Sequence, residues 1–89
     1  MIERDVLIVN KLGLHARAAA KFVTLASTYS SDIQVARNQR AVNGKSIMGV
    51  MMLAAAKGST VKIIAHGGDE QVALDKLTEL VNNRFGEPE

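Results

Sequence analysis

A histidine and an arginine stand two residues apart in the segment "NKLGLHARAAAKF", residues 10–22. His15 directly precedes an alanine-rich run that favours a helix, so its ring lies where unpaired N–H groups and the positive end of a helix dipole attract an anion. The guanidinium of Arg17 offers a planar set of donors to the same anion. The pattern suits a nucleophilic imidazole that holds a phosphoryl group. Spacing alone favours a plainer interpretation, a surface histidine beside a solvated arginine.

A second candidate site lies at Ser46, which opens the segment "SIMGVMMLAAA". The serine is first a helix N-cap, because its hydroxyl can accept a hydrogen bond from the first turn, but this position also tolerates a phosphate. The helix is apolar on two faces, and one sheet cannot bury both in so small a domain. We therefore expect exposed side chains that fit partners among Ile47, Met48 and Met51. The residues expected in the core are Val50, Leu53 and Ala54.

Other kinds of site are disfavoured. The segment "NGKS" at 43–46 lacks the glycine that a phosphate-binding loop requires, because Gln39 stands in its place. His66 has only His15 as a possible second ligand in a chain without cysteine, so we expect no metal site. A net charge of +2 and few aromatic residues disfavour nucleic-acid binding.

The N-terminal segment "MIERDVLIV" bears on localisation. It carries Glu3 and Asp5 where a signal peptide has basic residues and an uninterrupted apolar run, and no stretch of the chain reaches transmembrane length. We therefore expect a cytoplasmic protein without membrane insertion.

The elements that must position these residues follow the order βαββαβα. Strands are predicted at residues 2–9, 32–37, 40–44 and 59–67, where apolar and polar residues alternate, with Asn38 and Gln39 in a hairpin loop. Helices are predicted from residue 16 to about 29, over 46–58 with Gly58 as C-cap, and from Asp69 as N-cap until Gly86 and Pro88. The apolar stripes comprise Ala19, Phe22, Val23 and Ala26 in the first helix, and Ala73, Leu77 and Leu80, flanked by Leu74 and Val81, in the last. This order predicts one α+β domain over residues 1–89, an open-faced two-layer sandwich with a four-stranded antiparallel sheet and three helices on one face.

Two motifs resemble those of a known family. "GLHAR" at 13–17 is similar to the phosphohistidine site of the HPr family, the histidine-containing phosphocarriers of the phosphoenolpyruvate-dependent phosphotransferase system, and "GKSIMGVMMLAA" at 44–55 is similar to its regulatory serine site. The resemblance implies that His15 carries the phosphoryl group, that Arg17 steadies it, and that Ser46 is a regulatory phosphorylation site. The implied partner-binding residues are Ala16, Ala20, Ile47, Met48 and Met51.

The resemblance also implies partners and a mode of action. His15 would accept a phosphoryl group from phosphorylated enzyme I and pass it to a histidine on IIA proteins, as a carrier without a cofactor rather than an enzyme with turnover of its own. HPr kinase/phosphorylase is a further possible partner, and we expect a monomer. Sugar-transport and nitrogen-related branches stay open. The alternative is a regulatory interaction module that binds partners through Ile47, Met48 and Met51.

One residue departs from the family's pattern. A proline usually follows the arginine directly, and this chain has Ala18 there. Because proline fixes φ in the first turn of a helix, its replacement predicts a slightly more mobile His15 loop.

Overall fold

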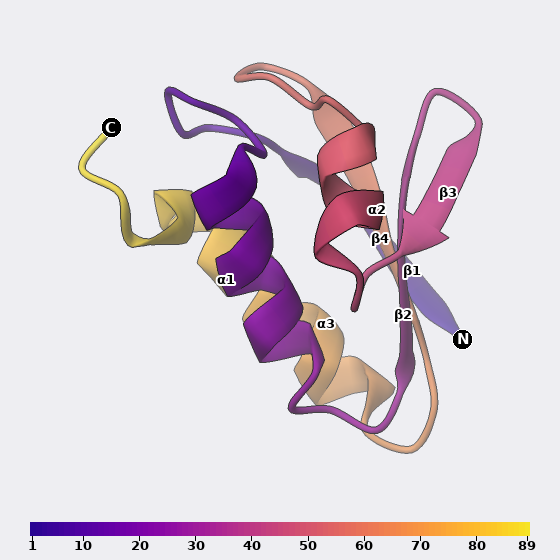
Figure 1. Cartoon of the computed structure of the whole chain (residues 1–89). Coiled ribbons are helices and arrows are strands. Elements are labelled where there is room, and N and C mark those ends of the chain that lie inside the picture. Colours follow the sequence, from indigo (N-terminus) through magenta and orange to yellow (C-terminus); the bar gives the residue numbers. More distant parts are fainter.

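Strands and helices alternate along the chain in the predicted order. The computed structural model describes residues 1–89 (Figure 1). The elements are β1 (Ile2–Leu7), α1 (Ala16–Ala26), β2 (Asp32–Arg37), β3 (Arg40–Asn43), α2 (Ile47–Met52), β4 (Thr60–His66), α3 (Glu70–Asn82) and a 3₁₀ turn, η1 (Arg84–Gly86). The strands form one antiparallel sheet in the order β1-β4-β2-β3. The predicted α+β fold with four antiparallel strands and three α-helices is confirmed.

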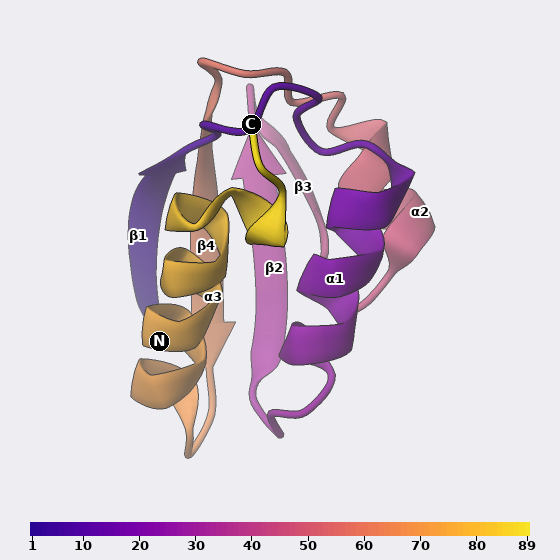
Figure 2. The ribbon, with the colours of Figure 1, turned by 90° about the vertical axis from the view of Figure 1, so that its left-hand side faces the viewer.

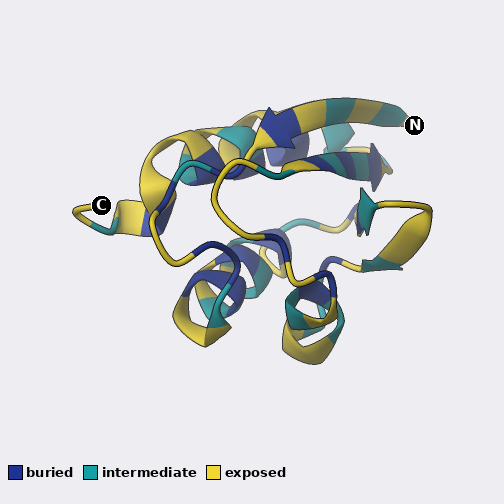
Figure 3. Cartoon of the chain, turned by 90° about the horizontal axis from the view of Figure 1, so that it is seen from above, coloured by how far each residue is buried: buried dark blue, intermediate teal, exposed yellow.

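The sheet has one buried face and one open face. In β4, Val61, Ile63 and Ala65 are buried, and the residues between them are more exposed. Ile33 and Val35 of β2 pair in register with Ala65 and Ile63. Because successive side chains of a strand point to opposite faces, all five share one face. The helices cover that face, and the other is open to solvent (Figures 2 and 3).

Helices α1 and α3 bury the apolar stripes that their sequences predict. The residues spaced three and four apart on each helix lie against the core, as expected for an amphipathic helix. The fully buried ones are Ala18, Ala19, Phe22 and Ala26 in α1, and Ala73, Leu74, Leu77 and Val81 in α3. Val23 and Leu80 are partly buried against the same core. None of the helices has the length and apolar character needed to cross a membrane.

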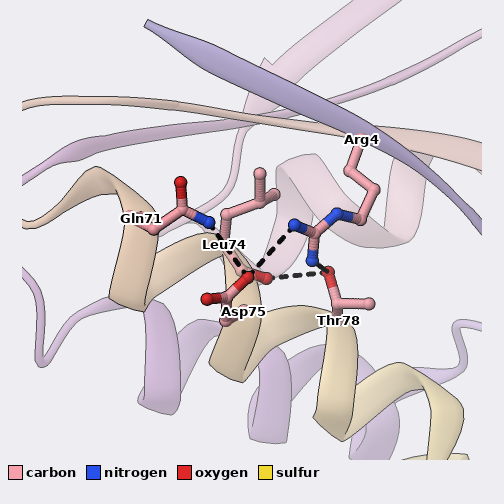
Figure 4. Close-up of polar contacts among 5 residues, drawn as sticks. All are labelled: Arg4, Gln71, Leu74, Asp75 and Thr78. Carbon is pink, nitrogen blue, oxygen red and sulfur yellow. Dashed lines mark hydrogen bonds and ion pairs between the residues drawn. The ribbon is translucent and has the colours of Figure 1, made fainter.

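A polar network ties the edge strand β1 to α3 (Figure 4). Arg4 donates from Nη1 to Thr78 Oγ1 at 3.2 Å and from Nη2 to Asp75 Oδ1 at 3.1 Å. Gln71 Nε2 donates to the same oxygen of Asp75 at 3.1 Å, and Thr78 Oγ1 donates to Leu74 O at 2.7 Å. An exposed ion pair alone contributes little to stability, but a guanidinium that donates to two side chains fixes their relative position.

Helix α2 is shorter than the sequence predicts, since it ends at Met52 instead of Gly58. The β2–β3 hairpin explains the early end. Arg37 Nη1 donates to Leu53 O at 3.0 Å, and Arg40 Nη1 donates to Met52 O at 3.4 Å. These side chains satisfy carbonyl groups that further helical turns would otherwise use.

The residues after α2 correct two further predictions. Ala54 has a positive φ of 50° and is exposed, so its prediction as a core residue was wrong, whereas Val50 and Leu53 are buried as expected. Gly58 is not a helix C-cap. It lies in the turn before β4, where its φ is 91° and its N–H donates to Ile8 O at 2.8 Å.

Smaller differences affect the other element ends. α1 ends at Ala26, three residues before the predicted Tyr29, and its continuation tightens into a turn in which Tyr29 N donates to Ala26 O at 3.2 Å. β1 ends at Leu7. The predicted hairpin loop is confirmed, because Asn38 and Gln39 have φ values of 51° and 69°, as a two-residue hairpin turn requires.

Candidate functional site

His15 occupies the N-cap position of α1. Its backbone is extended (φ −74°, ψ 178°), and its side chain makes no capping hydrogen bond. Its carbonyl accepts the N–H of Ala19 at 2.9 Å, which begins the helix. The N–H groups of Ala16, Arg17 and Ala18 make no hydrogen bond within the protein. The start of α1 therefore keeps three unpaired donors next to His15, and a proline in place of Ala18 would remove one of them.

The loop before His15 is pressed against the chain that follows α2. Gly13 has a φ of 67°, and a Cβ atom on it would lie only 2.5 Å from Ala55 O, so no other residue fits here without a shift. The next residue, Leu14, donates its N–H to the same oxygen at 2.9 Å. Asn10 is fully buried, and its Nδ2 donates to Gly13 O at 2.8 Å. These contacts fix the path of the loop into α1.

The tail after η1 runs towards the loop before α1 (Figure 2), and it brings the carboxylate of Glu87 to His15. Glu87 Oε2 lies 2.5 Å from His15 Nε2, and Glu87 Oε1 accepts a hydrogen bond from Asn10 Nδ2 at 3.0 Å. Lys11 N donates to Glu89 O at 2.9 Å, so the tail runs along the loop. The other ring nitrogen of His15, Nδ1, makes no hydrogen bond within the protein.

The electrostatics of Glu87 result from opposing effects. Burial alone would raise the pKa of its carboxyl group, but hydrogen bonds from Asn10 and His15 and the nearby charges of His15 and Lys21 outweigh burial and lower that pKa. Glu87 is therefore ionised at neutral pH. An ionised carboxylate has no proton to donate, so it acts only as a hydrogen-bond acceptor.

His15 and Arg17 line one open pocket of about 570 Å³. The loop, the start of α1 and the tail form its walls, with the lining residues Lys11, Leu12, His15, Ala16, Arg17, Glu87, Pro88 and Glu89. Arg17 is exposed, and its guanidinium takes part in none of the protein's hydrogen bonds or ion pairs. The pocket thus contains a ring nitrogen with no partner and a free cation that can contact an anion.

Ser46 stands at the start of α2 and caps it. Its Oγ accepts the N–H of Gly49 at 3.1 Å, which is the N-cap bond that the sequence predicts. The adjacent Lys45 donates from Nζ to Tyr29 O at 2.8 Å, and Lys45 N donates to Asn43 Oδ1 at 2.9 Å. The hydroxyl of Ser46 therefore has a structural role in the folded chain, whatever else it does.

The apolar surface of α2 differs in part from the expected one. Ile47 and Met48 are exposed, at 43% and 70%. Met51, which we expected beside them, is half-buried and packs against the core. Met52 is 59% exposed, and the sequence analysis did not single it out. On the neighbouring α1, Ala16 is exposed and Ala20 is half-buried.

Sequence reasoning missed two residues of the site, Asn10 and Glu87. Asn10 reads as a turn residue, and Glu87 lies 72 positions from His15 in a segment that reads only as the end of a helix. Their approach depends on the turn at η1, where Phe85 has a φ of 54° and is fully buried. No local pattern in the sequence carries this information.

Comparisons with known proteins show the family of the chain. The family model PTS-HPr, described as the PTS HPr component phosphorylation site, matches residues 2–83. The phosphocarrier protein HPr of Cupriavidus necator is 57% identical over 89 residues, which is 100% of both chains. The phosphocarrier protein NPr of Shewanella violacea is 40% identical and covers 97% of this chain and 94% of that protein. The crystal structure of HPr-C-His from Thermoanaerobacter tengcongensis superposes with a TM-score of 0.96 at 47% identity over 100% of both chains. The chain therefore belongs to the HPr family of phosphocarrier proteins.

Proposed function

We propose that the protein carries phosphoryl groups in the phosphotransferase system, with His15 accepting one from phosphorylated enzyme I and passing it to a histidine on IIA proteins. The observation that carries this proposal is the open start of α1. Three backbone N–H groups are unpaired there, and the free guanidinium of Arg17 lines the same pocket as the ring. A phosphoryl group on His15 would meet these donors and the positive end of the helix dipole.

The arrangement suits transfer in both directions. Phosphoryl transfer needs in-line positioning and stabilisation of charge on the moving group more than it needs covalent machinery. His15 lies at the mouth of an open pocket with 27% of its side chain exposed, so another protein can bring a histidine to it. A carrier must release what it accepts, and an exposed site with few fixed contacts favours release.

The test is phosphorylation by enzyme I and phosphoenolpyruvate, followed by intact-mass measurement. We expect wild type to gain one phosphoryl group and His15→Ala to gain none. Circular dichroism should show that His15→Ala is folded, because the side chain contributes little to the core. A second step, addition of a IIA protein, should remove the group. Wild type that stays unmodified while a known carrier is labelled would contradict the proposal.

We further propose that Ser46 is a regulatory phosphorylation site, with HPr kinase/phosphorylase as the corresponding enzyme. The position of the serine supports it, since Ser46 directly precedes the exposed Ile47 and Met48. A phosphate there adds about 1.5 to 2 negative charges at the edge of a surface that a partner would cover. Such a partner would have to desolvate the phosphate, so docking weakens while the fold is retained.

Ser46→Asp tests the charge effect, and Ser46→Asn is its matched control because both side chains cap helices well. Enzyme I should bind Ser46→Asp more weakly than Ser46→Asn, with the larger difference at low salt, where charges are less screened. Titration of enzyme I with each variant at two ionic strengths measures this. Equal affinities at low salt would leave Ser46 with its capping role alone.

A second candidate function is a regulatory interaction module, for which His15 would be incidental. The exposure of Ile47 and Met48 favours it, because exposed apolar side chains on a soluble domain often bind partners. The mass experiment separates the two functions. A module that only binds partners would retain its affinity for them in the His15→Ala variant and would show no phosphoryl gain.

A further inference from the structure

The carboxylate of Glu87 is held in place from two sides. One oxygen contacts Nε2 of His15 at 2.5 Å, and the other accepts from Asn10 Nδ2 at 3.0 Å. Asn10 cannot turn its amide around. Its nitrogen faces two acceptors, Glu87 Oε1 and the carbonyl of Gly13, while its Oδ1 is buried without a partner. A flipped amide would place oxygen against both acceptors, so the fully buried Asn10 holds Glu87 in one orientation.

This contact decides which ring nitrogen carries the proton. The hydrogen bond from Asn10 and the charge of Lys21 lower the pKa of Glu87 whether or not His15 is charged, so its carboxylate is ionised at neutral pH and only accepts hydrogen bonds. Nε2 must therefore be the N–H donor in the contact with Glu87. A neutral imidazole has a single N–H group, so the lone pair lies on Nδ1. That nitrogen makes no hydrogen bond within the protein and is free to attack.

We propose that Glu87, oriented by Asn10, is a positioning residue that keeps one proton on His15 Nε2 both before and after Nδ1 takes up the phosphoryl group. The inference rests on the proposed carrier function and specifies how His15 performs it. Glu87 touches the ring and never the phosphoryl group, and its effect is exerted through the protonation state of Nε2. The buried amide of Asn10 keeps the acceptor oxygen on the ring.

The bonds and charges balance without any proton transfer. In acceptance, the Nδ1 lone pair forms a bond to phosphorus while the bond from phosphorus to the donor histidine breaks, and its electron pair stays on the donor nitrogen. The His15 ring then bears substituents on both nitrogens and a positive charge, which the Glu87 carboxylate offsets. In release, the N–P electron pair returns to Nδ1, and a neutral imidazole leaves with the same Nε2 proton. Without that proton the leaving group would be an imidazolate anion, which is a much poorer one.

The other charged groups around the ring have different contacts. Lys11 and Glu89 pair with each other at 3.5 Å, Arg17 has no partner, and Lys21 donates to Phe85 O at 2.8 Å. Arg17 and Lys11 line the pocket with the ring but form no hydrogen bond with it. Among all of these groups, only Glu87 forms a hydrogen bond with the imidazole.

Glu87→Gln is the decisive variant, and Glu79→Gln is its matched control. In glutamine one of the two carboxylate oxygens becomes an NH2 donor, so either Asn10 Nδ2 or His15 Nε2–H would face another donor. Glu79→Gln removes the same charge at an exposed residue of α3 that pairs with Lys76 and does not line the pocket. The first measurement is two-bond ¹H–¹⁵N NMR of the His15 ring in unphosphorylated protein, at a pH where histidine is neutral. We expect a roughly tenfold excess of the Nε2–H tautomer in wild type and in Glu79→Gln, and a much smaller excess in Glu87→Gln.

The second measurement is the pH profile of phosphoryl release from the phosphorylated proteins. Loss of the carboxylate should make the phosphorylated ring lose its Nε2 proton at lower pH, so release from Glu87→Gln should slow at a lower pH than release from wild type or Glu79→Gln. The same tautomer ratio in wild type and Glu87→Gln, or an excess of the Nδ1–H form in wild type, would overturn the proposal. The NMR result needs no phosphorylation. Failure of enzyme I to label wild type would therefore contradict the carrier function alone.

Discussion

The starts of α1 and α2 have the same backbone shape but opposite hydrogen bonding. Both N-cap residues, His15 and Ser46, have extended backbones. Ser46 accepts the N–H of Gly49, so its helix satisfies one of its own donors. His15 accepts none, and the first three N–H groups of α1 stay unpaired. An uncapped helix start can bind an anion, whereas a capped one stabilises the fold. The chain therefore gives up local stability at the start of α1.

Helix length explains why the open start belongs to α1. α1 has 11 residues and buries four side chains, whereas α2 has six residues and buries only Val50. A short helix with little buried surface depends more on its cap, because most helical stability in proteins comes from packing of an apolar face. The longer helix can lack a cap and keep its start available.

The largest effect is expected at the open start. Arg17→Ala should leave the fold intact and slow phosphoryl transfer roughly ten- to a hundredfold, through loss of a charge-assisted contact worth about 1.5–3 kcal/mol. Quench-flow measurement of transfer from enzyme I tests this. Lys57→Ala removes one exposed positive charge that does not line the pocket of His15 and serves as the control. If Arg17→Ala transferred the phosphoryl group at the wild-type rate, Arg17 would have no role in the site.

The next effect is expected at the closed start. Ser46→Ala deletes the oxygen that accepts the N–H of Gly49, so the free energy of unfolding should fall by about 0.5–2 kcal/mol. Urea unfolding followed by circular dichroism measures it. Labelling of His15 by enzyme I should be unchanged in the same variant. A free energy of unfolding equal to that of wild type would mean that the hydrogen bond at 3.1 Å contributes nothing to stability. The two helix starts would then not differ in capping energy.

The converse change would close the open start. His15→Ser and His15→Ala both lose the contact with Glu87, but only serine supplies a capping oxygen. His15→Ser should therefore be the more stable of the two by about 0.5–1 kcal/mol, and neither should accept a phosphoryl group. Denaturant unfolding of the pair gives the difference directly. If alanine is as stable as serine at this position, the N–H groups of α1 are already satisfied by solvent.

A third helix start gives the smallest effect. Asp69 is the N-cap residue of α3, yet its carboxylate accepts from Ser30 N, Ser31 N and Ser31 Oγ instead of capping its own helix. The hydrogen bond from the Ser31 hydroxyl, then the one from Ser30 N, lowers the pKa of Asp69 to about 2. The stabilisation is thus present above the unfolded-state pKa of about 3.9 and is lost as the pH falls through about 2.

Asp69→Asn should remove this acid-labile contribution. We expect the stability of the variant to fall less steeply than that of wild type between about pH 4 and pH 2. Thermal unfolding at several pH values measures the slope. Asp75→Asn, a change at an exposed carboxylate that contacts Arg4 and Gln71 but no backbone amide, is the control. Parallel slopes for Asp69→Asn and wild type would contradict a role for Asp69 in acid stability.

The sequence predicts what depends on neighbouring residues and misses what depends on distant ones. The N-cap at Ser46, the hairpin turn at Asn38 and Gln39 and the buried stripes of α1 and α3 follow from local patterns. The end of α2 does not, because Arg37 reaches its carbonyls from the β2–β3 hairpin. Helix propensities summed over the alanines after Leu53 cannot predict this hydrogen bond from Arg37.

The same limit applies to the candidate site. The spacing of His15 and Arg17 on one helix turn is visible in the sequence, and so is the family motif that contains them. The carboxylate that faces the ring is not visible, because η1 and the tail bring Glu87 back across 72 residues. The sequence reasoning considered only positive surroundings for the ring. The structure adds a negatively charged group beside the ring, the carboxylate of Glu87.

The missing side chain of Gly13 has a consequence beyond local packing. It lets the loop that holds His15 lie directly on the oxygen of Ala55, in the segment that follows α2. The offset between the His15 ring and the exposed Ile47 and Met48 is therefore set by the backbone before any partner binds. A protein that docks on α2 and reaches His15 must present its own reactive group at this one offset. Partners that differ in sequence would therefore need binding surfaces of similar shape.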